Sequence, residues 1–129
     1  MREPYQAPQR SWPRKFSDAG RGMWIAVRGG GSFTVHVLIS ALVVGGAVFF
    51  RVSPTEWCLL ILCIAVVFAV EIQNTALEVL AKAVRQEYDP IVRDSLDIGS
   101  GAVLAAAIGA TTVGLAIFLP YVRQLLGSL

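Results

Sequence analysis

The chain has 129 residues, of which 55% are hydrophobic and 16% charged, with a formal net charge of +2 and a mean hydropathy of +0.62. Average globular proteins carry about 25% charged residues, so this composition excludes a disordered protein and a protein that coats nucleic acid. The surplus of apolar residues favours a chain that lies in a lipid bilayer.

The first part of the chain predicts a tail followed by a helix on the membrane surface. Residues 1–11 are polar, contain two prolines and show no period, so we expect a flexible tail. Residues 12–28 interleave aromatic and aliphatic side chains with Arg and Lys. This pattern suits an amphipathic helix whose rings lie at the acyl boundary and whose cations lie at the phosphates. Glycines at 29–31 predict a break before the next helix.

Three apolar stretches predict three transmembrane helices, which together with the surface helix make the fold class all-α. The first, 33–50, has His36 as its only strongly polar side chain and reaches roughly 27 Å as a helix, close to the hydrocarbon thickness. The second, 57–86, is longer than the bilayer requires, so one end must project. The third, 98–119, is rich in Ala and Gly, which permit close packing in lipid, and ends before Pro120. We expect His36 to be a partnered or interfacial residue rather than a base.

The distribution of basic residues predicts the orientation. Nine of the eleven Lys and Arg residues lie in the N-terminal arm or in the segment 82–97, whereas Arg51 and Arg123 lie on the other side. Cytoplasmic segments carry the excess of basic residues in membrane proteins. We therefore expect a multi-pass protein whose N-terminus and second connection are cytoplasmic.

The most informative feature is a polar stripe at the end of the second span. Spacings of three, four and seven place four polar side chains on one helix face: Glu71, Asn74, Thr75 and Glu78. Carboxylates near the hydrocarbon boundary are costly and mark functional sites. Glu71 and Glu78 lie about 10 Å apart along a helix axis, which suits separate roles as base and metal ligand. The alternative is that the stripe joins helices or reaches to the interface without chemistry.

A second polar cluster follows in the connection between the last two spans. It contains Glu87, Tyr88, Asp89, Arg93, Asp94 and Asp97. The two clusters are expected to face each other where the second and third spans meet the cytoplasm. Carboxylate oxygens without Cys or His partners indicate Mg²⁺ and phosphate rather than zinc. Asp97 also suits the start of the third helix, so a simple capping role is the alternative for that residue.

These motifs carry a resemblance to a known family. They read Glu71-Ile-Gln-Asn74-Thr75-Ala76-Leu77-Glu78, then Glu87-Tyr88, then Asp97-Ile-Gly-Ser100-Gly101-Ala102-Val103-Leu104. Over roughly residues 14–119 the chain resembles the prokaryotic diacylglycerol kinase and undecaprenol kinase family. The resemblance implies one membrane kinase-like domain over 12–129 in the bacterial cytoplasmic (inner) membrane, assembled as a homotrimer with active sites shared between subunits.

The resemblance also implies a reaction and the residues that perform it. The expected function is ATP- and Mg²⁺-dependent phosphorylation of a membrane lipid alcohol, diacylglycerol or undecaprenol, at the cytoplasmic face. Glu71 would be the general base and a lipid contact, with Asn74 orienting it, and Ser100 would border the lipid. Glu78 would hold the Mg²⁺ of MgATP. The nucleotide would be bordered by Glu78, Glu87, Tyr88, Asp89 and Asp97.

Three positions depart from the family pattern. Gly30 stands where a metal-binding Glu is usual, Leu96 where a phosphate-contacting Lys is usual, and Lys82 where an Asp is usual. Each lost metal or phosphate contact should cost several kcal/mol of transition-state stabilisation unless it is replaced. Lys82 or Arg93 could supply the cation. The alternative function is a non-catalytic or altered-specificity relative that keeps the scaffold.

Overall fold

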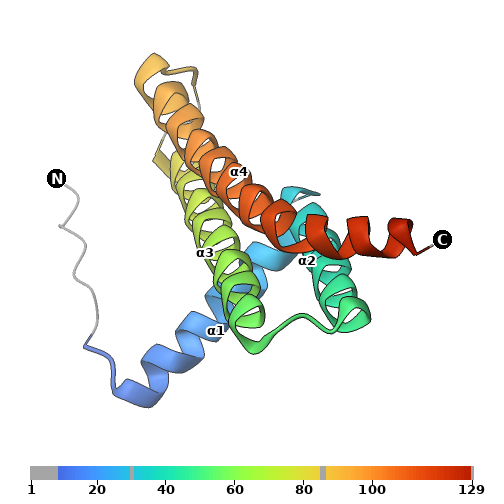
Figure 1. Cartoon of the computed structure of the whole chain (residues 1–129). Helices are drawn as coiled ribbons and strands as arrows, with labels where there is room; N and C mark the ends of the chain where they lie inside the picture. Colours follow the sequence, from blue (N-terminus) through green and yellow to red (C-terminus); the bar gives the residue numbers. More distant parts are fainter. Residues whose placement is uncertain (1–8, 30, 85–86, 129) are drawn as a thin grey trace, which may run out of the picture.

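The computed structural model describes residues 9–29, 31–84 and 87–128, and within them it contains helices and no strand (Figure 1). The helices are α1 (Trp12–Gly29), α2 (Gly31–Phe50), α3 (Pro54–Val84) and α4 (Pro90–Gly127). The all-α fold class predicted from the sequence is therefore confirmed. The tail 1–8 and Gly30 lie outside the described residues, so the expectations that rest on them stay predictions.

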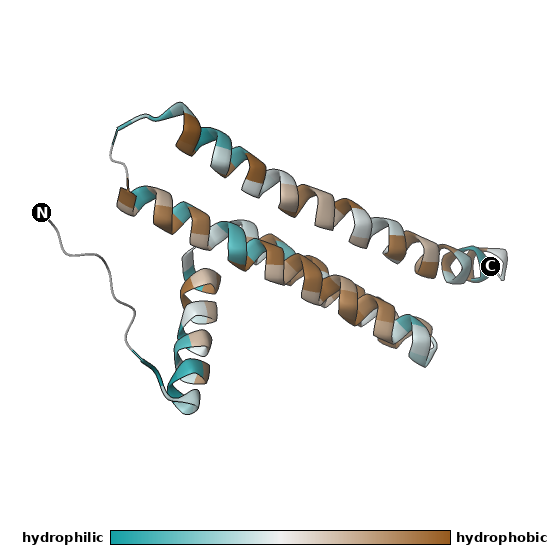
Figure 2. Ribbon diagram, turned by 90° about the vertical axis from the view of Figure 1, so that its left-hand side faces the viewer, coloured by the Kyte–Doolittle hydropathy of each residue, from teal (hydrophilic) through white to brown (hydrophobic). Residues whose placement is uncertain are grey.

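Helix α1 runs across the other three helices rather than alongside them (Figure 2). Ala26 is its buried residue, whereas Trp12, Phe16 and Trp24 are exposed. The Lys15 Nζ lies 4.5 Å from the centroid of the Trp12 ring, and the Arg28 guanidinium lies 5.5 Å from that of Trp24. Exposed rings paired with cations are what a helix lying in the membrane interface presents.

Helices α2, α3 and α4 are long and apolar enough to cross a membrane, which confirms three candidate spans. Their outward-facing apolar side chains, such as Leu42 and Leu104, are open to the surroundings, as expected for surfaces that lie in lipid. The 31 residues of α3 and the 38 of α4 are longer than the roughly 20 residues that a bilayer requires. The end of α3 and the start of α4 project together beyond α1 and α2 (Figures 1 and 2).

Helix α4 is longer at both ends than the predicted span 98–119. It starts at Pro90 because the Asp89 side chain accepts a hydrogen bond of 2.9 Å from the backbone N–H of Ile91, and proline is favoured at a first helical position. Asp97 lies in the third turn, so the suggestion that Asp97 starts the helix is wrong. The helix continues past Pro120, and its last turns run at an angle to the rest (Figure 1). A proline inside a helix removes a hydrogen bond and causes such a bend.

The hairpin between α2 and α3 is held by a dense set of contacts. The Glu56 carboxylate accepts hydrogen bonds from the backbone N–H of Ser53 at 2.7 Å and from the Tyr121 hydroxyl at 2.7 Å. Ser53 Oγ in turn accepts from the backbone N–H of Glu56, which completes a capping box at the start of α3. The Phe50 ring packs against the rings of Phe118 and Tyr121. This end of the bundle is closed and well partnered.

Candidate active site

The predicted polar stripe lies on the face of α3 that packs against the other helices. Glu71 is 4% exposed and Asn74 is 8% exposed. The other buried residues of α3 are Leu60 and Val67, which follow the same helical spacing on the same face. On this face of α3 the buried apolar side chains of Leu60 and Val67 are therefore followed by the buried carboxylate of Glu71 and the buried amide of Asn74. Burial of an ionisable group is costly unless it is partnered or used.

The Glu71 carboxylate lies beside the single histidine of the chain. The distance between His36 Nε2 on α2 and Glu71 Oε2 on α3 is 3.9 Å, and the His36 side chain is 16% exposed. One turn before, the rings of Phe33 and Phe68 pack with their centroids 5.2 Å apart. This contact holds α2 against α3 at the level of Glu71. It confirms His36 as a partnered residue.

Asn74 of α3 lies against Gly99 of α4, where the two helices pack closely. Its Nδ2 donates a hydrogen bond of 3.2 Å to Glu78 Oε1. Its Oδ1 is buried and has no hydrogen-bond partner among the residues that the structure describes. A side chain at Gly99 of α4 would place its Cβ 2.5 Å from this oxygen, so only glycine fits there. Since a carboxylate accepts hydrogen bonds and does not donate them, Glu78 fixes the amide in this orientation.

Thr75 completes the stripe but does not face the site. Its hydroxyl donates to the backbone carbonyl of Glu71 at 3.0 Å, one turn earlier in the same helix. Such bonds to the preceding turn are common for threonine within helices, and this one uses the hydroxyl proton. The polar side chains of the stripe that do not bond to the backbone of α3 in this way are Glu71, Asn74 and Glu78.

A pocket of about 390 Å³ lies between the projecting parts of α3 and α4. It is lined by Glu78, Ala81, Lys82, Glu87, Val92 and Leu96. Within the described ranges, no three side chains of His, Cys, Asp or Glu gather closely enough to hold a metal ion by themselves. Mg²⁺ is usually held by one or two carboxylates together with substrate phosphates. The Glu78 and Glu87 carboxylates fit that requirement, since both are exposed and border one pocket.

Two of the other predicted nucleotide residues, Tyr88 and Asp97, contact Arg93 in a separate network, and the third, Asp89, caps the start of α4. The Arg93 guanidinium donates hydrogen bonds of 3.2 Å to the Tyr88 hydroxyl and to the Asp94 carboxylate, and its Nε lies 3.9 Å from Asp97 Oδ2. The Asp97 side chain is 73% exposed, and Ser100 is also exposed. Asp97 lies beside Arg93 of its own helix and does not line the pocket that Glu78 and Glu87 border. One chain therefore presents two groups of predicted site residues.

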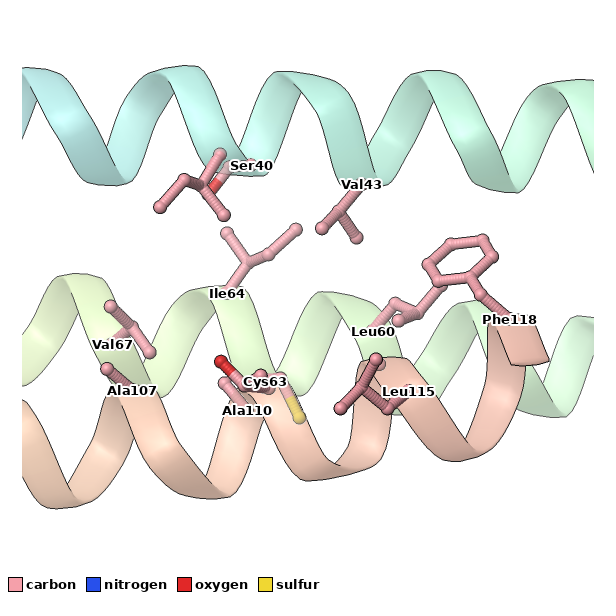
Figure 3. Close-up of a pocket in the computed structure, with 13 residues that line it drawn as sticks. Ser40, Val43, Leu60, Cys63, Ile64, Val67, Ala107, Ala110, Leu115 and Phe118 are labelled. Carbon is pink, nitrogen blue, oxygen red and sulfur yellow. The ribbon is translucent and has the colours of Figure 1, made fainter.

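An apolar pocket of about 290 Å³ lies within the bundle, one helical turn from Glu71 (Figure 3). Ser40 and Val43 of α2 point into it from one side, and Leu60, Ile64 and Phe118 point into it from α3 and α4. The end of the pocket that is nearest Glu71 is formed by Val67 and Ser40. Val67 lies one turn before Glu71 on α3, and Ser40 lies one turn after His36 on α2. Apart from a few small polar groups, the lining offers hydrocarbon, so the pocket suits an apolar chain.

Sequence reasoning did not identify the contact between His36 and Glu71. A signal was present, because charged and titratable polar residues inside membranes usually pair with one another. His36 lies within the apolar run of α2, and Glu71 directly follows the apolar run of α3. Which residues meet across two helices depends on how the helices are rotated and shifted. That information is absent from spacing within one helix.

Comparisons with known proteins give matches over most of the chain. Residues 17–118 match the sequence profile of the family described as prokaryotic diacylglycerol kinase. The chain is similar to an undecaprenol kinase of Bacillus subtilis (strain 168), with 31% identity over 107 residues that cover 83% of this chain and 87% of that protein. It is also similar to a diacylglycerol kinase of Synechocystis sp. (strain ATCC 27184 / PCC 6803 / Kazusa), with 32% identity over 96 residues. That match covers 74% of this chain and 55% of the relative.

Proposed function

The chain belongs to the prokaryotic diacylglycerol kinase family and is a lipid kinase of that type, and we propose that it phosphorylates a membrane lipid alcohol. In this reaction the γ-phosphoryl group of ATP is transferred, with Mg²⁺, to the hydroxyl group of the lipid. The reaction takes place at the cytoplasmic face. The acceptor is diacylglycerol or undecaprenol, the two alcohols that the names of the relatives indicate. The observation that carries the proposal is a buried carboxylate, Glu71, between an apolar pocket on one side and a pocket bordered by carboxylates on the other.

Glu71 acts as the general base. The lipid hydroxyl loses its proton to the Glu71 carboxylate while its oxygen forms a bond to the γ-phosphorus. The bond between that phosphorus and the oxygen bridging to the β-phosphate breaks, and ADP leaves with the electron pair. Phosphoryl transfer depends chiefly on positioning and charge neutralisation, so a small set of side chains is sufficient. The apolar pocket one turn away supports this role, because it can hold the hydrocarbon part of the acceptor.

Glu78 and Glu87 hold the nucleotide end of the reaction. When bound, Mg²⁺ supplies charge neutralisation on the phosphates. Asn74 donates to Glu78 and keeps that carboxylate turned toward the pocket.

Lys82 supplies the cation that the family pattern usually places at position 96. Lys82 and Leu96 line the same pocket, so a positive charge on α3 can reach the space that a side chain on α4 would otherwise fill. Lys82 forms no ion pair within the described residues, whereas Arg93 is held by the carboxylates of its own helix. The presence of Lys82 in this pocket therefore favours an active kinase over a relative that has lost its activity.

The remaining residues complete the site in a homotrimer. Asp97 and Ser100 of α4, and Tyr88 just before this helix, are exposed in a single chain. In the proposed trimer in the bacterial inner membrane, these residues border the nucleotide and lipid bound beside a neighbouring subunit. The cytoplasmic position of this end follows from the excess of basic residues in the N-terminal arm and in 82–97.

A phosphorylation assay tests the proposal. The full chain, purified in lipid micelles, is given labelled ATP with and without Mg²⁺ and either diacylglycerol or undecaprenol. We expect labelled lipid from at least one acceptor, and loss of the label in E71Q and E78A. Absence of label from the unmodified protein with both acceptors contradicts the proposal.

A second candidate function is nucleotide or lipid binding without turnover, favoured by Gly30 and Leu96. It predicts ATP binding that does not depend on Mg²⁺ and no transfer of label. The combined substitution of Gly30→Glu and Leu96→Lys would then raise activity from background, whereas in an active enzyme the same change would have a small effect.

A further inference from the structure

The Glu71 carboxylate has one polar partner in the part of the chain that the structure describes, and that partner belongs to another helix. The neighbouring polar groups on α3 are engaged elsewhere: the Asn74 amide donates to Glu78, and the Thr75 hydroxyl donates to the Glu71 backbone carbonyl. The remaining contact is with Nε2 of His36 at 3.9 Å. His36 is thus the side chain that can orient the Glu71 carboxylate.

A buried base needs such a partner. A free carboxylate at the end of a glutamate side chain can rotate among several positions, and a displacement of about 1 Å can reduce a rate by about a hundredfold. Bases in active sites are commonly oriented by a third group. The present distance is longer than a hydrogen bond, but bonds at catalytic sites are often long before the substrate binds and shorten in the complex.

The surroundings of His36 suit this task. Phe33, one turn earlier on α2, is buried and packs against Phe68 of α3, so the two helices are locked where the imidazole meets the carboxylate. Ser40, one turn later, lines the apolar pocket. His36 therefore lies between the packed aromatic pair and the pocket proposed for the lipid tail.

We propose that His36 is a positioning residue for this reaction, in which its imidazole N–H holds the Glu71 carboxylate toward the lipid hydroxyl. The inference rests on the proposed lipid kinase function and assigns a role to a residue of α2. His36 does not contact the nucleotide pocket, so its contribution concerns the rate of transfer and not the binding of MgATP.

The first test measures the contact directly and does not depend on activity. Because His36 is the only histidine in the chain, protein labelled with ¹⁵N-histidine gives one set of imidazole signals in micelles. We expect E71Q to move these signals and E78Q to leave them in place. If the imidazole chemical shifts do not change in E71Q, the proposal is overturned whether or not the protein is active.

The second test separates positioning from folding. We expect H36L to lower kcat about 10- to 100-fold with KM for MgATP unchanged, and H36Q, which keeps an N–H donor, to recover most of that loss. The matched control is T34V, a change at an exposed position two residues away, which should behave as the unmodified chain. Equal losses in H36L and H36Q, or no loss in H36L, overturn the positioning role. An unmodified chain without kinase activity contradicts the proposed function itself, a result distinct from either of these.

Discussion

Helix α3 carries two glutamates that contact another helix, Glu56 in its first turn and Glu71 beyond its middle, and the surroundings of the two differ. Glu56, at the hairpin end, accepts hydrogen bonds from Ser53 and Tyr121 and returns its backbone N–H to Ser53. Glu71 is more deeply buried, yet among the residues that the structure describes its one polar contact is 3.9 Å long, and Asn74 Oδ1 has no hydrogen-bond partner.

Under the proposed function, this difference distinguishes a structural carboxylate, Glu56, from a catalytic one, Glu71. Buried polar groups are nearly always hydrogen-bonded, so an exception indicates a group kept available for another purpose. Fully partnered networks add rigidity, whereas incompletely partnered ones cost stability. We therefore expect the contacts of Glu56 to stabilise the bundle and the groups around Glu71 to serve the proposed reaction. The following experiments test this comparison, from the largest expected effect to the smallest.

Exchanging each glutamate for glutamine should give opposite results. E71Q removes the general base and should lower kcat at least about a thousandfold, within the usual range for such groups, while leaving the unfolding midpoint unchanged or higher. E56Q should lower the midpoint and leave kcat unchanged. Phosphorylation assays and thermal unfolding in micelles measure both. Equal losses of activity in the two variants would contradict the distinction.

The contact between Gly99 and Asn74 should be intolerant of a side chain. G99A forces a Cβ toward a position 2.5 Å from Asn74 Oδ1, and such overpacking typically costs about 1–3 kcal/mol of stability. Because α3 and α4 would separate at the site, kcat should fall as well. G109A on the same helix meets open space and serves as the control. Similar unfolding midpoints for the two variants would show that the close approach is absent.

Replacing Lys82 should affect nucleotide binding selectively. In K82A we expect KM for MgATP to rise about tenfold, the size of one charge-assisted phosphate contact, with little change in KM for the lipid. The double variant K82A/L96K returns a cation to the opposite wall of the same pocket and should restore most of the loss. Failure of that restoration would show that the two positions do not share one phosphate.

The smallest effect is expected at the hairpin end. Y121F removes the hydroxyl that donates to Glu56 but keeps the ring that packs against Phe50. The unfolding midpoint should fall slightly and kcat should not change. A loss of activity in Y121F would mean that the two ends of α3 are coupled, which the comparison excludes.

The sequence predicted the helices more reliably than their ends. Apolar runs of about 18 residues and the Arg-rich aromatic stretch 12–28 were sufficient for three spans and a surface helix, because the hydrocarbon thickness fixes the length of a span. The start of α4 was misplaced, since a polar helix outside the membrane lacks an apolar signal. The Asp89-Pro90 pair that begins it is a capping signal that the prediction overlooked.

The amino-acid sequence determined which residues share one face of one helix, and so it identified Glu71, Asn74 and Glu78 as a set, since helical periodicity is a local property. The tertiary structure decided which residues of different helices meet. It brought His36 to Glu71, Gly99 to Asn74 and Leu96 to the pocket of Lys82. These contacts depend on the rotation and shift of packed helices, which are set by the fit of many side chains at once and not by the spacing of any few.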